Sequence, residues 1–104
     1  MMRRHLKRSP DRCPTHPGAL LREIVLPAMP VKKTKFAAAL GISRQALYDL
    51  LAERQPVSPL LAVKLGLLFE QSPASWLNMQ TAYDLWHAER TVDRTKFKPL
   101  KLVG

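Results

Sequence analysis

Four polar side chains near the middle of the chain are spaced so that they share one face of an α-helix. They stand at i, i+1, i+4 and i+5 and are Arg44, Gln45, Tyr48 and Asp49. A guanidinium can donate two hydrogen bonds to guanine, and a primary amide can pair in the same way with adenine. A phenol can touch a thymine methyl group or a phosphate, and a carboxylate can accept from cytosine or pair with a nearby arginine. This set predicts the reading of base edges in DNA.

The residues around these four polar side chains predict a helix-turn-helix, which would place them on its second helix. Over residues 33–52, a first short helix ends at Gly41, and Ser43 is placed to cap a second helix that begins directly after it. Glycine adopts a positive φ after a helix end without steric cost. A serine hydroxyl accepts a hydrogen bond from a free N–H of the next helix. The apolar positions 40, 42, 47 and 50 then face inward, which leaves the polar set on the outside.

Polar residues beside this second helix suit contacts with the DNA backbone. They carry a positive charge or a hydroxyl group and are Lys33, Thr34, Lys35, Ser43 and Arg54. Three of them open the first helix of the motif, where the positive end of the helix dipole also favours phosphate. On an isolated helix, such a polar face would more simply be a solvated surface. The framework of the motif favours the DNA-binding interpretation here.

Helical periodicity and start signals predict an all-α chain of five helices, with the reading helix third. The first helix begins at Pro17 and is expected to close at Pro27 and Pro30. The fourth helix, over residues 59–69, is apolar on nearly every side. We therefore expect it to be the central helix of the bundle. No strand-like alternation is seen anywhere in the sequence.

The net charge of +9 suits a polyanionic partner, but most of the excess lies near the two ends. Residues 17–90 carry eight basic and six acidic side chains. We expect residues 1–15 to be a basic flexible arm, residues 16–90 to be the helix-turn-helix domain, and residues 91–104 to be a basic tail. Basic ends strengthen binding to any nucleic acid, and they are also common as solubilising segments.

Other classes of function find little support in the sequence. Cys13 is the only cysteine, so no disulfide can form within the chain and a reducing compartment is expected. His5, Cys13 and His16 do not match a zinc spacing. His87 is the third histidine, and none of the three has a recognisable catalytic partner. We expect no catalytic residue, metal or cofactor, and, without a signal peptide or an apolar membrane span, a cytoplasmic protein with no membrane partner.

Several stretches resemble one family within the Cro/CI-type (XRE) helix-turn-helix class, the HigA antitoxins, also called virulence-associated protein I (VapI). The resemblance runs from residue 16 to about residue 89. It rests on the His16-Pro17-Gly18 start, residues 40–47 (LGISRQAL), residues 56–59 (PVSP), residues 72–80 (SPASWLNMQ) and residues 82–86 (AYDLW). Members often have glutamine at the start of the second helix, where this chain has Lys32 and Lys33. A phosphate contact survives that change, but a base contact by glutamine does not.

The resemblance implies a five-helix, lambda-repressor-like DNA-binding domain in a small bacterial antitoxin. Such proteins bind a ribosome-dependent mRNA endonuclease toxin (HigB-like), dimerise through the last helix and repress their own operon. A single reading helix covers only a few base pairs, so a homodimer on an inverted repeat is also expected from geometry. Among the aromatic residues of the last helix, we assign Trp76 to the core, and Tyr83 and Trp86 to the dimer interface.

Two alternatives share these features. A stand-alone helix-turn-helix repressor without a toxin partner would carry the same DNA-binding residues, and only the family-like run after residue 72 argues against it. A protein-interaction module that no longer binds DNA would not need Arg44 and Gln45 or their positively charged flank.

Overall fold

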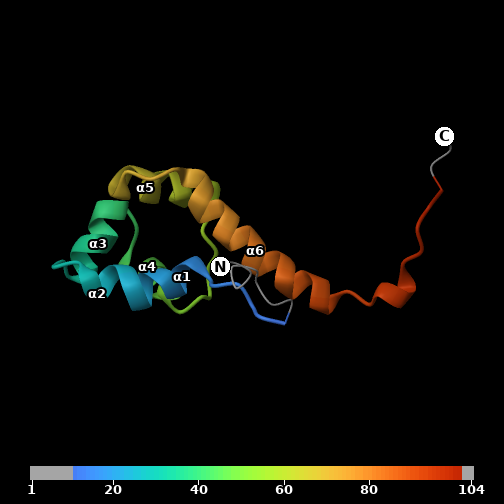
Figure 1. Ribbon diagram of the computed structural model, residues 1–104. Coiled ribbons are helices and arrows are strands. Elements are labelled where there is room, and N and C mark those ends of the chain that lie inside the picture. Colours follow the sequence, from blue (N-terminus) through green and yellow to red (C-terminus); the bar gives the residue numbers. More distant parts are fainter. Residues whose placement is uncertain (1–10, 102–104) are drawn as a thin grey trace, which may run out of the picture.

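The computed structural model describes residues 11–101, and all of the regular secondary structure in this part of the chain is helical (Figure 1). The elements in chain order are α1 (Pro17–Leu20), a π-helical turn (Leu21–Val25), α2 (Leu26–Ala28), α3 (Lys33–Leu40), α4 (Arg44–Leu51), α5 (Pro59–Phe69), α6 (Pro73–Thr91) and a 3₁₀ turn (Arg94–Lys96). Because α1, the π-helical turn and α2 form one continuous run, the expected all-α arrangement of five helices is confirmed.

The first helical run differs from the expectation that Pro27 closes it. Pro27 lies inside the run, which continues to Ala28. A proline has no N–H to donate and its ring collides with the carbonyl four residues earlier in a regular α-helix. The π-helical turn widens the helix just before this point, and the Leu26 N–H bonds to the Leu21 carbonyl five residues back. The wider turn gives the proline ring its room.

The hydrophobic core lies where α3, α4 and α5 meet the first helical run and the start of α6. Its largest fully buried side chains are Leu21, Phe36, Leu40, Leu47, Leu50 and Leu65. The expectation that positions 40, 47 and 50 face inward is confirmed, and Ile42 is half-buried against the same cluster. Trp76 is only 3% exposed, as expected of a core residue.

The prediction that α5 is the central helix is wrong. Only Ala62, Leu65 and Gly66 of this helix are buried. Gly66 lies so close to the start of α6 that a side chain there would collide with the Gln71 carbonyl, which fixes one face of α5 against α6. The opposite face is open to solvent, at the top of the body in Figure 1. An evenly apolar helix gives no signal of which side will be covered.

The two ends of the described chain behave differently. Pro14 is buried, and the Cys13 Sγ lies 3.6 Å from the His87 Nε2, so residues just before α1 pack beside α6. The other end leaves the body after α6, and residues 92–101 are exposed throughout (Figure 1). Most of the expected basic arm, residues 1–10, lies outside the described residues, as do the last three residues of the tail.

Candidate nucleic-acid interface

The turn between α3 and α4 is built by the two residues that the sequence indicated. Gly41 ends α3 with φ 69° in the left-handed region, and its N–H and that of Ile42 return to carbonyls of the last turn of α3. Ser43 then caps α4, because its hydroxyl accepts a hydrogen bond of 3.0 Å from the Ala46 N–H. Both predicted features of the helix-turn-helix are confirmed.

The outward face of α4 carries the four side chains whose spacing suggested base reading. Arg44, Gln45 and Tyr48 are exposed and Asp49 is half-buried, whereas Leu47 and Leu50 on the other side of the helix are buried. The structure therefore brings the four polar groups together on one accessible surface. Their individual contacts with DNA remain predictions.

Asp49 joins two neighbouring residues of this surface in a polar network. Its Oδ1 accepts hydrogen bonds from the Gln45 Nε2 at 3.0 Å and from the Arg54 Nη2 at 2.9 Å. Arg54, and then Gln45, lower the pKa of the Asp49 carboxyl, so this group is ionised at neutral pH. The pairing offsets the negative charge that would otherwise repel phosphate. It also uses only one of the two N–H groups of the Gln45 Nε2, so the second N–H and the Oε1 can still pair with a base.

The start of α3 contributes positive charge beside α4. Lys33, Thr34 and Lys35 are exposed in the first turn of α3. The Lys33 Nζ lies 5.9 Å from the centre of the Tyr48 ring, within the range of a cation–π contact. Of the residues expected to contact the DNA backbone, Lys33 and Arg54 therefore lie against the predicted reading side chains, and Ser43 caps α4.

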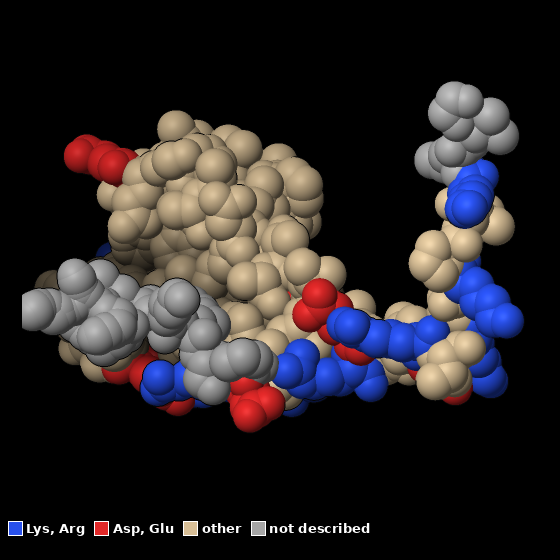
Figure 2. All heavy atoms as spheres, turned by 45° about the vertical axis from the view of Figure 1, so that its right-hand side comes forward, with Lys and Arg blue, Asp and Glu red and all other residues tan. Residues whose placement is uncertain are grey.

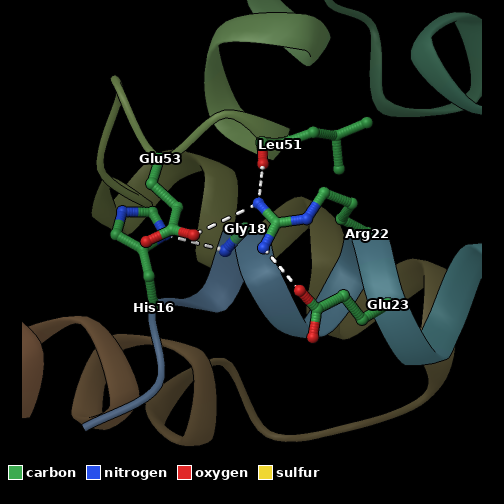
Figure 3. Close-up of polar contacts among 6 residues, drawn as sticks. All are labelled: His16, Gly18, Arg22, Glu23, Leu51 and Glu53. Carbon is green, nitrogen blue, oxygen red and sulfur yellow. Dashed lines mark hydrogen bonds and ion pairs between the residues drawn. The ribbon is translucent and has the colours of Figure 1, made fainter. Parts of the chain in front are cut away.

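Sequence analysis missed an arginine that holds the end of α4. The Arg22 Nη1 donates to the Leu51 carbonyl at 2.6 Å and to the Glu53 Oε2 at 3.1 Å, while its Nη2 pairs with Glu23 at 2.7 Å (Figure 3). Leu51 is the last residue of α4, where free carbonyls favour a cation. The first helical run thereby fixes the end of α4.

His16 and Gly18 complete this connection. Gly18 packs so closely on α4 that a side chain there would collide with the Leu50 carbonyl. Its N–H donates to the His16 Nδ1 at 2.8 Å, and this histidine is only 3% exposed (Figure 3). Burial lowers the pKa of His16, in keeping with an uncharged ring that accepts a hydrogen bond. The Tyr83 ring of α6 meets the His16 ring edge-on, with centres 4.7 Å apart.

The two aromatic residues assigned to a dimer interface are half-buried within the chain. Tyr83 contacts His16, and its ring centre lies 4.5 Å from that of His87. The Arg90 guanidinium carbon lies 3.7 Å from the centre of the Trp86 ring. Both side chains therefore have partners in the same molecule, and their role in a dimer stays a prediction.

Charge is distributed unevenly over the molecule. In Figure 2, Lys and Arg side chains gather along the lower edge of the view and on the tail, whereas the upper part of the body shows no blue. Within residues 11–101, no group of three His, Cys, Asp or Glu side chains is placed to hold a metal ion. No helix in the same residues is long and apolar enough to cross a membrane.

Comparison with known proteins gives the family. The chain is 39% identical over 75 residues to virulence-associated protein I of Dichelobacter nodosus, an alignment that covers 72% of this chain and 69% of the relative. It is 33% identical over 95 residues to antitoxin HigA-1 of Vibrio cholerae, covering 89% and 90% of the two chains. The chain belongs to the HigA antitoxin family. No family model matches it.

A solved structure of an antitoxin supports the same assignment. The antitoxin GraA in complex with its operator is 36% identical to this chain and superposes with a TM-score of 0.77, covering 96% of this chain and all of the other. The match spans the helix-turn-helix and all of the flanking helices, so the fold of this HigA family member is that of an antitoxin whose structure was solved with DNA.

Proposed function

We propose that this HigA family member is a sequence-specific DNA-binding antitoxin that represses its own operon as a dimer on an inverted repeat. The observation that carries the proposal is the exposed polar face of α4, which the helix-turn-helix presents as a reading surface. The similarity to GraA, solved with its operator, supports it. The proposed activity is binding, with no catalytic residue or cofactor.

The proposed contacts divide into base reading and positioning on the backbone. Arg44 donates to guanine, and Gln45 pairs with adenine through its Oε1 and the Nε2 N–H that does not bond to Asp49. Tyr48 touches a thymine methyl group or a phosphate, and Asp49 orders Gln45 and Arg54 beside the bases. Phosphate contacts come from the residues that flank the reading helix, namely Lys33, Thr34, Lys35, Ser43 and Arg54.

The dimer follows from the size of the reading helix. α4 has eight residues, which span roughly 12 Å and so face only a few base pairs. Two copies must therefore bind half-sites about one DNA turn, or roughly 34 Å, apart. Operator binding of this kind places the protein on the promoter of its own genes, where it blocks transcription.

The second half of the proposal concerns a protein partner. Similarity to antitoxin HigA-1 supports neutralisation of a HigB-like mRNA endonuclease toxin by direct binding. Co-expression with the toxin encoded beside this gene tests it, because an antitoxin restores growth and co-purifies with the toxin. If no such toxin binds, the chain acts as a stand-alone repressor, and the DNA-binding half of the proposal is unaffected.

A gel-shift titration tests the DNA-binding half. The wild type is compared with Arg44→Ala and Tyr48→Ala on the DNA upstream of its own gene and on a scrambled duplex. Loss of the Arg44 base contact should weaken operator binding by roughly 5- to 150-fold, equivalent to ~1–3 kcal/mol. Lys98→Ala is the matched control, because it removes a positive charge from the exposed tail and should change binding to the two duplexes by the same factor. Equal binding to both duplexes by every variant would overturn the assignment of α4.

A further inference from the structure

Glu53 adopts a backbone conformation that is unusual for its residue type. Its φ is 64°, in the left-handed region, and within residues 11–101 Glu70 is the only other residue besides glycine with a positive φ. A side chain in this region crowds its own backbone, so glycine is the usual residue there after a helix. Such a strained residue persists where the surrounding structure holds it, and strained residues cluster at functional sites.

The turn at Glu53 closes the end of α4. The Glu53 N–H donates to the Leu50 carbonyl at 3.0 Å, and the Arg54 N–H donates to the Asp49 carbonyl at 2.8 Å. These two hydrogen bonds are those of a Schellman motif, which requires a left-handed residue at the position of Glu53. The turn reverses the chain and brings Arg54 back over the last turn of α4.

The side chain of Arg54 reaches the proposed reading surface because of this turn. Its Nη2 and Nε lie 2.9 Å and 3.3 Å from the Asp49 Oδ1, the oxygen that also accepts from Gln45. The place of the Arg54 guanidinium beside the proposed base-reading residues therefore depends on the backbone conformation of Glu53.

Arg22 supplies the contact that holds Glu53 in its strained conformation. The Arg22 Nη1 lies 3.1 Å from the Glu53 Oε2 (Figure 3), and the two side chains are 39% and 29% exposed, so the ion pair is partly shielded from water. The same Nη1 donates to the Leu51 carbonyl. This arginine thus joins the first helical run both to the end of α4 and to the turn that follows it.

We propose that Glu53 is a positioning residue for DNA recognition, because its ion pair with Arg22 holds the left-handed turn that places Arg54 against Asp49. Glycine would make this turn without support, whereas glutamate needs the pair to offset its strain. Operator recognition then depends on the first helical run, which carries none of the proposed base-reading residues. The inference rests on the proposed function and extends it to the residues that shape the end of α4.

Two substitutions of Glu53 separate the ion pair from the strain. Glu53→Ala removes the carboxylate but keeps a side chain in the left-handed region, whereas Glu53→Gly removes both. Glu53→Ala should lower the ratio of operator affinity to random-DNA affinity about 5-fold, as loss of one weak base contact would. It should also raise the pKa of the Asp49 carboxyl, which Arg54 chiefly lowers. Glu53→Gly should keep both at wild-type values.

Fluorescence anisotropy on the two duplexes measures the ratio, and NMR of the carboxyl carbon measures the Asp49 pKa without DNA. Arg22→Met keeps the aliphatic length of the side chain, removes the guanidinium and should behave as Glu53→Ala does. Adding Glu53→Gly to Arg22→Met should restore both values. The matched control is Glu70→Ala, because it removes the same charge at a left-handed position, exposed at the end of α5, and should change neither value.

Losses in Glu53→Ala and Arg22→Met that are absent from the two Glu53→Gly proteins support the proposal. Equal losses in Glu53→Ala and Glu53→Gly overturn it, as does an Asp49 pKa or an affinity ratio that Glu53→Ala leaves unchanged. A loss in Arg22→Met that Glu53→Gly does not restore also overturns it, because Arg22 would then act through the Leu51 carbonyl. A wild type that binds both duplexes equally overturns the proposed function instead, and the Asp49 pKa still decides whether Glu53 positions Arg54.

Discussion

Asp49 stands among the residues expected to read DNA although its charge has the same sign as phosphate. Its hydrogen bonds from Gln45 and Arg54 explain how it can stay there, since both donors point at one carboxylate oxygen. From the sequence, Asp49 is expected either to face cytosine or to pair with a nearby arginine, and the structure supplies Arg54. The consequence for binding is that both donors are held by Asp49 before DNA arrives.

Asp49→Asn should release Arg54 and remove a negative charge from the reading surface. We expect tighter binding to random-sequence DNA and a salt dependence steeper by up to about 0.9 in log–log slope, the value for one additional phosphate contact. Fluorescence anisotropy over a series of salt concentrations measures both. Asp93→Asn removes the same charge at the far end of α6, so an equal gain in that variant would contradict a local role for Asp49.

His16 makes the stability of the protein depend on pH. Burial is the main cause of its lowered pKa, which Glu53 and Asp84 partly oppose and Arg22 reinforces. The unfolded chain therefore takes up a proton at a higher pH than the folded chain does. Stability from this residue is complete above the ordinary histidine pKa of about 6.5 and is lost as the pH falls through the lower folded value.

His16→Asn should make the free energy of unfolding less dependent on pH between about 7.5 and 5, because asparagine can accept the Gly18 N–H without titrating. Urea unfolding at a series of pH values measures this slope for both proteins. The other titrating groups are common to the two chains and cancel in the difference. A slope as steep in the variant as in the wild type would show that His16 is not its source.

At the scale of helices, serine caps begin both α4 and α5, with hydroxyl-to-N–H distances of 3.0 Å and 3.2 Å. Ser43→Ala and Ser58→Ala should each lower the free energy of unfolding by about 1 kcal/mol, the usual cost of removing a cap. Only Ser43 lies at the proposed DNA surface. Ser43→Ala should therefore also weaken operator binding, measured with stability by anisotropy and urea unfolding. Equal DNA binding by the two variants would contradict the placement of Ser43.

Local signals in the sequence were enough to predict the helices and the helix-turn-helix. Gly41 ends α3 and Ser43 caps α4 through contacts with residues close to them in the sequence. Both effects can therefore be predicted without knowledge of the tertiary structure. The covered side of α5 was not predictable, because its apolar residues lie all around the helix. Pro27 was expected to close the first helix. The helix instead continues past it, because a π-helical turn, which was not predicted, precedes the proline.

Part of the candidate site was predictable because it also depends on local signals in the sequence. The outward face of α4 follows from spacing alone. The hydrogen bond from Arg22 to the Leu51 carbonyl joins residues 29 apart in sequence, and nothing local to either residue indicates it. The same holds for the contact between His16 and Tyr83, which links the start of α1 to α6 across most of the chain.

On the scale of the whole molecule, the exposed tail carries Arg94, Lys96, Lys98 and Lys101 away from the body. We propose that the tail strengthens binding to DNA regardless of the base sequence. Removal of residues 92–104 should lower the affinities for operator and random DNA by the same factor. It should also reduce the salt slope by about 0.9 for each phosphate that the tail neutralises. A competition titration on both duplexes measures the ratio. A fall confined to the operator would instead give the tail a role in sequence reading.

The most direct test of DNA reading by a two-fold pair of α4 helices is a hydroxyl-radical footprint on the region upstream of the gene. The wild type should protect two patches on one side of the duplex, about one turn or roughly 34 Å apart. Arg44→Ala should protect neither patch at the same protein concentration. A single continuous patch without two-fold spacing, or a wild-type pattern that Arg44→Ala reproduces, would contradict DNA reading by paired α4 helices.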